Sequence, residues 1–213
     1  MKEEKEMKLS ELLSLLKNAT EVEELDKNRN DIEALIPQVK IMFNYDQKNR
    51  YHQFDLWMHS LHTVVNLPKN RKDDMLYLAA LLHDIGKPTT RCKGTREGDT
   101  DLHYYGHPLR SMEIVRDEVI PVLNRKGNLL SDLEVKRLLY YVEHHDDRMS
   151  VKLKHVRRHL KLVDFEEFQN LMLLQVADAK AHVLLPIVVQ RIETCTKLAG
   201  EEGQDLYQKL LEE

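Results

Sequence analysis

The residues with the clearest chemical potential lie in one short segment, Leu81 to Lys87, which reads Leu-Leu-His-Asp-Ile-Gly-Lys. His83 and Asp84 are adjacent and follow an almost continuous apolar run, so we expect both side chains to be buried. Burying them without partners is costly, and a bound metal ion would accept both as ligands. Gly86 is expected to turn the chain and bring Lys87 toward a phosphate in the same pocket. The segment therefore predicts a metal site beside a phosphate-binding lysine.

A further carboxylate, Asp178, lies late in a predicted helix that begins near Phe165. Phe168, Leu171 and Met172 mark the buried face of this helix. Asp178 follows Leu171 by seven residues and falls on the same side. A carboxylate on a buried face needs a partner, which could be a metal ion or a lysine or arginine side chain. The spacing leaves both alternatives open.

Two more histidines are candidates because of their positions on predicted helices. His145 lies three residues after Val142, at the margin of a buried face, whereas His144 points almost to the opposite side. His107 precedes Pro108 at a predicted helix N-terminus, where the helix dipole disfavours imidazolium and favours a neutral ring. The spacing predicts His145 as the pocket residue, and it leaves His107 as a ligand or as a capping residue.

The helix predicted from Asp55 to about Asn66 contains both His59 and His62, and spacing does not choose between them. Neither residue lies at the centre of the apolar face that Leu61 and Val64 define. His103 could make a loop contact. The other histidines away from the predicted pocket are expected to be surface or packing residues; they are His52, His155, His159 and His182.

Taken in order, these segments resemble the HD superfamily of metal-dependent phosphohydrolases. Leu81 to Lys87 is similar to the His-Asp signature of that family, Asp55 to Leu61 to the helix with its first histidine, and Gln175 to Asp178 to its terminal Ala-Asp element. The Trp-x-His-Ser-Leu and Tyr-Gly-His-Pro segments look closest to the HD region attached to bacterial tRNA nucleotidyltransferases. Nothing before Tyr51 resembles the nucleotidyltransferase head, so we predict hydrolysis rather than nucleotide addition.

The resemblance implies a divalent-metal site with four ligands and further groups for the substrate. The metal ligands would be His59, His83, Asp84 and Asp178. The groups for the substrate or a second metal ion would be Lys87, His107 and His145. Asp84 and Lys87 would also be catalytic, Asp84 by orienting a metal-bound water or accepting its proton. Mixed nitrogen and oxygen ligands favour Mn, Fe, Co, Ni or Zn, with Mg possible.

The implied activity is hydrolysis of a phosphomonoester or a phosphodiester. The expected partner is a phosphorylated small molecule, a nucleotide or an RNA end. One rival is a phosphatase specific for a nucleoside monophosphate. A second is a catalytically inactive, metal-bound HD module that senses a nucleotide or binds RNA, and a third is a helical scaffold without metal. The sequence names neither the exact substrate nor the oligomeric state.

Helical spacing of the apolar residues predicts an all-α fold, a compact multi-helix HD-domain bundle. We expect a single domain over 1–213, with an N-terminal helical extension at 1–46, an HD core at 47–185 and C-terminal helices at 186–213. Capping-box spacing marks three helix starts, at Thr20 with Glu23, Ser131 with Glu134, and Asp164 with Glu167. The polar stretch from Pro88 to Gly106 is predicted to be a long functional or mobile loop without strands, and to contribute to specificity.

Composition limits the class of protein. Hydrophobic residues make up 42% of the 213 residues and charged residues 32%, and the formal charge of −4 gives no global attraction to nucleic acid. Charged residues interrupt every apolar run of membrane-spanning length, and the segment Met1 to Lys8 lacks the apolar core of a secretion signal. Cys92 and Cys195 are too few for a disulfide framework or a cysteine zinc site. A cytoplasmic protein is therefore expected.

Overall fold

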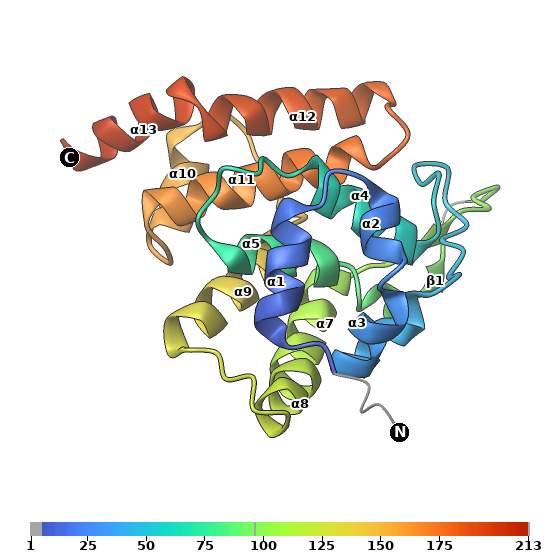
Figure 1. Cartoon of the computed structure of the whole chain (residues 1–213). Helices are drawn as coiled ribbons and strands as arrows, with labels where there is room; N and C mark the ends of the chain where they lie inside the picture. Colours follow the sequence, from blue (N-terminus) through green and yellow to red (C-terminus); the bar gives the residue numbers. More distant parts are fainter. Residues whose placement is uncertain (1–5, 96, 213) are drawn as a thin grey trace, which may run out of the picture.

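The computed structural model describes residues 6–95 and 97–212, and helices dominate this part of the chain (Figure 1). The helical elements are α1 (Leu9–Asn18), α2 (Val22–Asp26), α3 (Arg29–Leu35), η1 (Pro37–Met42), α4 (Leu56–Asn66), α5 (Asp74–Leu82), α6 (Lys87–Thr90), α7 (His107–Ile114), η2 (Val115–Val119), α8 (Ile120–Arg125), α9 (Asp132–His144), α10 (Leu153–Leu160), α11 (Phe165–Lys180), α12 (Pro186–Ala199) and α13 (Glu201–Leu211). The all-α prediction is confirmed. The division into 1–46, 47–185 and 186–213 stays a prediction.

Helix α5 forms the centre of the molecule. Every residue from Met75 to Leu82 is buried, as the unbroken apolar run predicts. The Asp73 side chain accepts a hydrogen bond from the backbone N–H of Met75 and so caps the first turn. Helices α1, α4, α9 and α11 all pack against α5. Because the helix is enclosed on all sides, the residues that follow Leu82 are delivered into the protein interior.

The N-terminal helices share this hydrophobic core. Leu12, Leu16 and Leu25 are fully buried, in the same cluster as the side chains of α5. Helix α3 ends at Leu35, and the 3₁₀ turn η1 begins at Pro37, because proline is tolerated in the first turn of a helix but not in its interior. Figure 1 shows α12 and α13 along the upper edge of the molecule and α1 to α3 below them.

Two of the three predicted capping boxes are present as expected. Ser131 with Glu134 opens α9, and Asp164 with Glu167 opens α11. The prediction at Thr20 is wrong by one residue, because the box of α2 is formed by Glu21 and Glu24. The Thr20 hydroxyl still donates to the Glu24 carboxylate, 3.1 Å away, but the backbone enters the helix one position later.

The loop from Pro88 to Gly106 contains a short antiparallel hairpin that the sequence did not predict. Strand β1 (Cys92–Lys93) pairs with β2 (Leu102–His103), with Cys92 opposite His103. Two-residue strands are too short to show an alternating pattern. Arg96, within this loop, lies outside the described residues. Gly106 then adopts φ = 78°, a left-handed conformation that suits glycine, and α7 begins at the next residue.

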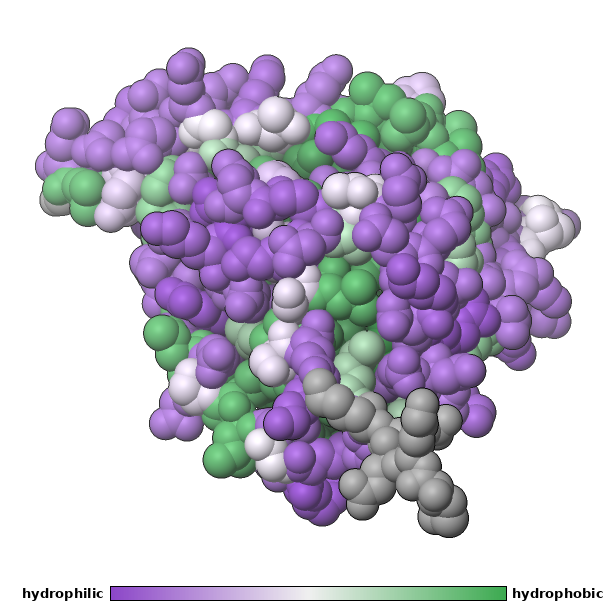
Figure 2. All heavy atoms as spheres, viewed as in Figure 1, coloured by the Kyte–Doolittle hydropathy of each residue, from purple (hydrophilic) through white to green (hydrophobic). Residues whose placement is uncertain are grey.

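No helix in the described part of the chain is long and apolar enough to cross a membrane. The face drawn in Figure 2 is mostly hydrophilic, with an apolar area over the beginning of α12. Three large hydrophobic side chains are exposed there, namely Leu184, Ile187 and Val189.

Candidate metal centre and active site

The turn after α5 carries His83 and Asp84 into the interior, where they are 0% and 1% exposed. Gly86 is needed here because another helix approaches closely, whereas the turn itself has φ = −79°, which any residue adopts. A Cβ at position 86 would lie 2.6 Å from the backbone nitrogen of Ser111, on α7. The Ser111 hydroxyl instead accepts a hydrogen bond of 2.9 Å from the Gly86 N–H. Glycine therefore lets α7 pack directly against the turn.

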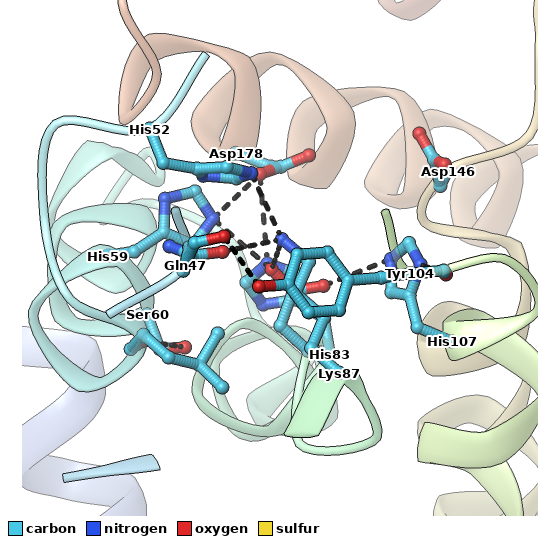
Figure 3. A network of polar contacts seen from close by, with 12 residues as sticks. Gln47, His52, His59, Ser60, His83, Lys87, Tyr104, His107, Asp146 and Asp178 are labelled. Carbon is cyan, nitrogen blue, oxygen red and sulfur yellow. Dashed lines mark hydrogen bonds and ion pairs between the residues drawn. The ribbon is translucent and has the colours of Figure 1, made fainter. Parts of the chain in front are cut away.

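Four side chains from three parts of the chain converge on one point, and Figure 3 labels His59, His83 and Asp178 among them. They are His59 of α4, His83 and Asp84 after α5, and Asp178 of α11. The His59 Nε2 atom lies 3.1 Å from Asp178 Oδ1 and 3.4 Å from Asp84 Oδ2. His83 Nε2 lies 3.2 Å from Asp84 Oδ2 and 3.7 Å from Asp178 Oδ1. All four side chains are almost completely buried.

These four residues fit a divalent metal ion. Buried atoms of each lack an aligned hydrogen-bond partner, namely both ring nitrogens of His59, Nε2 of His83, Oδ1 of Asp84 and Oδ1 of Asp178. Unpartnered buried polar atoms are costly and rare, so this concentration calls for a ligand. Atoms about 2.1 Å from one ion lie roughly 3 to 3.5 Å from each other, and the distances between these donors are of that size. His59, His83 and Asp178 satisfy the spacing of a metal-binding group.

Hydrogen bonds fix the orientation of three imidazole rings around the site. The Nδ1 atoms of His83, His107 and His145 each lie 2.8 Å from a backbone carbonyl oxygen three residues earlier. Since a carbonyl oxygen only accepts, Nδ1 must carry a proton in each ring. The Nε2 atoms are therefore left to face the site, which is the arrangement found in metal-ligating histidines.

His107 and His145 lie on the other side of Asp84. Their Nε2 atoms are 3.1 Å and 3.4 Å from Asp84 Oδ1, and 3.1 Å from each other. Asp84 therefore directs Oδ2 toward His59 and His83, and Oδ1 toward the second pair. His83, Asp84 and His145 also satisfy the spacing of a metal-binding group. The arrangement could hold a second ion or a phosphate oxygen.

Lys87 is held in the same place. Its Nζ atom lies 2.6 Å from Asp84 Oδ2 and donates to Gln47 Oε1 at 3.0 Å. The Nε2 atom of His52 is 3.4 Å away. The lysine is 5% exposed yet lines the cavity, so a positive charge is directed at any bound anion.

The charges of the site are strongly coupled. Burial alone would raise the pKa of Asp84, but His83 and Lys87 lower it well below its usual value. The same holds for Asp178. Burial alone would raise its pKa, but His182 and His59 lower it well below its usual value. Burial alone would lower the pKa of His83, but the carboxylates of Asp84 and Asp178 raise it to about 10. The two carboxylates and the His83 ring therefore stabilise each other's charged forms.

The structure separates the two ambiguous histidine pairs. The His62 ring stacks on Phe54, with ring centroids 4.0 Å apart, and lies outside the cluster to which His59 contributes. His144 turns toward Asp147, with Nδ1 2.9 Å from Oδ2, while the adjacent His145 faces Asp84.

Sequence reasoning missed other residues of the site. His52 and His182, expected to be surface or packing residues, form a backbone bridge, and both line the cavity. Their rings lie 4.5 Å apart. His182 lies four residues after Asp178, on the same side of the helical path, and this spacing could have identified it. His52 lies in an irregular segment that offers no periodic signal.

Arg191 of α12 was also missed. Its Nη2 atom donates to the backbone carbonyl of His145 at 2.6 Å and lies 3.5 Å from Asp178 Oδ2. Nη1 donates to Asp146 at 3.1 Å. The guanidinium therefore links two segments of the site, and it also lines the cavity.

The cluster borders a cavity of about 870 Å³. Asp84, Lys87, His107 and His145 line this cavity, together with residues from the first turns of α12. Such a volume is ample for an organic phosphate, since ligand pockets commonly span about 300 to 1,000 Å³.

Comparison with known proteins identifies the family of the chain. Residues 55–182, more than half of the chain, match the family described as HD domain. A segment of 83 residues, 38% of this chain, is 30% identical to the multifunctional CCA protein of Thioalkalivibrio sulfidiphilus (strain HL-EbGR7). The similarity covers only 19% of the length of that relative. The resemblance read from the sequence is confirmed, and the chain belongs to the HD domain family, within the superfamily of metal-dependent phosphohydrolases.

Proposed function

We propose that this protein is a divalent-metal-dependent phosphohydrolase that cleaves a phosphomonoester or phosphodiester of a nucleotide or an RNA end. The observation that carries the proposal is the group of buried, unpartnered histidine and aspartate atoms beside a large cavity. Membership of the HD domain family supports the reaction class. The similarity to a protein named for CCA supports a nucleotide or RNA substrate.

In this proposal the metal ligands are His59, His83, Asp84 and Asp178. A divalent ion bound there would lower the pKa of a water molecule and polarise the phosphoryl group. Two imidazoles and two carboxylates suit Mn, Fe, Co, Ni or Zn, and Mg remains compatible with the carboxylates.

The protein groups have distinct tasks around the phosphate. Asp84 is ionised, so it can accept a hydrogen bond, and then the proton, from the attacking water. The Lys87 ammonium would neutralise charge on a phosphate oxygen. His107 and His145 would bind a second phosphate oxygen or a second ion through their Nε2 atoms.

The test begins with protein purified without a metal-chelating resin. Its metal content is measured by mass spectrometry. Hydrolysis is then assayed on nucleoside monophosphates, cyclic nucleotides, phosphorylated RNA ends and a chromogenic diester, with Mn, Co, Ni, Zn or Mg added. We expect metal-dependent hydrolysis of at least one class, and loss of both metal and activity in Asp84→Asn.

Two results would contradict the proposal in different ways. Metal binding without hydrolysis of any phosphoester would leave the metal site intact but favour an inactive module. If Asp84→Asn keeps both its metal content and its activity, the proposed metal site is wrong.

A further inference from the structure

We propose that Tyr105 forms a stacking subsite for the nucleobase of the substrate. This inference rests on the proposed function, because it names the part of the substrate that lies beyond the phosphate. The observation behind it is an exposed, rigidly oriented aromatic ring that lines the same cavity as Asp84 and Lys87.

Tyr104 and Tyr105 are adjacent but point in different directions. Tyr104 is 8% exposed, and its hydroxyl donates to the backbone carbonyl of Gln47 at 2.5 Å. Tyr105 is 66% exposed, which is high for so large an aromatic side chain. The buried tyrosine anchors the segment, so the exposed one is displayed from a fixed backbone.

The His103 side chain supports one face of the Tyr105 ring. The tyrosine ring stacks on the imidazole of His103, with centroids 5.3 Å apart and planes inclined by 12°. The His103 ring is itself fixed, because its Nε2 atom lies 2.8 Å from Asp99 Oδ2 and its backbone pairs in the hairpin. One face of Tyr105 is thus covered, and the exposed area belongs to the other face and the edges. An oriented ring with one free face is a base-stacking platform, since every nucleobase presents a flat π surface.

Tyr105 and the phosphate-binding groups line the same cavity and are close in the chain. Tyr105 is two residues before His107, so their Cα atoms are at most about 7 Å apart. The Nε2 atom of His107 is 3.1 Å from Asp84 Oδ1. In a nucleotide, one sugar ring separates the base from the phosphate, which matches this short connection.

The rest of the cavity also favours a substrate with a flat apolar part. A phosphate and a metal ion need only a fraction of about 870 Å³. Met149, Ile187 and Val188 contribute apolar side chains to the cavity lining. Ile187 is 61% exposed, so this side chain is open to a ligand, whereas Val188 is buried.

The experiment measures binding, by isothermal titration calorimetry, to the full chain saturated with Mn²⁺. The probes are the phosphonate analogues of AMP and of ribose 5-phosphate, which share the sugar and acid but differ in the base and cannot be hydrolysed. We expect the AMP analogue to bind at least about tenfold more tightly. Tyr105→Ala should weaken the AMP analogue by about tenfold, in line with measured base stacking, and change the ribose analogue less than twofold.

Two matched variants accompany this measurement. Tyr105→Phe keeps the ring and should bind the AMP analogue as the wild type does. Leu129→Ala removes another exposed hydrophobic side chain, 77% exposed and outside the cavity lining, and should change neither affinity. Thermal melting checks that each variant is folded. A short single-stranded RNA is the second ligand tested. If it binds more tightly than the AMP analogue, and this binding depends on Tyr105, the base belongs to an RNA end. If it binds more weakly than the AMP analogue, the base belongs to a free nucleotide.

The inference is overturned if Tyr105→Ala leaves both affinities unchanged or weakens both equally. Binding is read directly, so this outcome does not depend on turnover. Tyr105-dependent binding without metal-dependent hydrolysis would contradict only the proposed function.

Discussion

Two clusters of histidine and aspartate lie next to the end of α9. They differ in whether their buried polar atoms have hydrogen-bond partners. The first contains His83, Asp84 and His145; the second contains His144, Asp147 and His159. Both satisfy the spacing of a metal-binding group. Consecutive residues, 144 and 145, send their rings into different clusters.

The second cluster supplies its own partners. Asp147 Oδ2 lies 2.9 Å from both His144 Nδ1 and Arg158 Nη2. The Nδ1 atom of His159 is 3.0 Å from the Tyr140 hydroxyl. None of the unpartnered buried atoms found among the described residues belongs to this cluster, whereas Asp84 and its neighbours hold several. Residue types and spacing therefore do not define a metal site unless buried donor atoms are also left without hydrogen-bond partners.

Replacing one carboxylate in each cluster gives the strongest contrast. Asp84→Asn should lower hydrolysis by roughly 1,000-fold or more and remove the bound metal, because a group shared by both halves of the site is lost. Asp147→Asn should change activity by less than about threefold. Initial rates and metal content of the two variants check this. Equal losses would mean that both clusters take part in the reaction.

The adjacent histidines test the same contrast at higher resolution. His145→Ala should lower kcat/KM by roughly 100-fold, the usual effect of removing one donor aimed at the reacting group. His144→Ala should leave kcat/KM within about threefold. Steady-state kinetics with one metal at a fixed concentration gives both values. The reverse order would show that the wrong ring had been assigned to the site.

The pH dependence of metal binding distinguishes the clusters by their protons. His83, with a pKa near 10 in the metal-free protein, must release the Nε2 proton to bind an ion. Metal affinity should therefore rise by about tenfold per pH unit between about pH 7 and 9, with roughly one proton released. Calorimetry in buffers of different protonation enthalpy measures both. In contrast, burial lowers the pKa of His159 to about 4, so a metal ion bound by this ring would displace no proton from it at neutral pH.

The same shift has a consequence for stability with a defined sign. Because the pKa of His83 is raised on folding, its protonated form stabilises the metal-free protein below the unfolded value of 6.5, and this contribution disappears as the pH rises through about 10. Denaturation of the metal-free protein should show declining stability over that window. An affinity for metal that does not change with pH would contradict the assignment of His83 as a ligand.

The smallest expected effect concerns the cation of the second cluster. Arg158 is 57% exposed, so Arg158→Ala should lower the free energy of unfolding by less than about 1 kcal/mol. Water can replace the guanidinium at the partly exposed Asp147 carboxylate, and we expect no additional metal to bind. Urea denaturation and metal analysis provide the two readings. More bound metal than the wild-type protein carries would contradict the distinction drawn between the clusters.

Much of the helical fold could be predicted because apolar spacing records burial directly. The unbroken run of α5 and the capping pairs at Ser131 and Asp164 gave both element type and position. The hairpin at Cys92 escaped because a two-residue strand has no period, and the role of Gly86 escaped because only tertiary contact with α7 explains it.

The site was predictable only in part, for related reasons. Asp178 lies on the buried face of a helix, and His83 and Asp84 directly follow the apolar run of α5, whereas the position of His59 came from family resemblance. His52 could not be found, since it lies in an irregular segment and approaches the site through folding alone.

Arg191 contacts the site but lies beyond the residues that match the family. The match ends at residue 182, so a fragment cut there would retain every histidine and aspartate of the cluster. It would lose α12, and with it the positive charge beside Asp178 and the donor to the His145 carbonyl. The segments that carry His145 and Asp178 would then lose the side chain that links them, although every histidine and aspartate of the cluster would still be present.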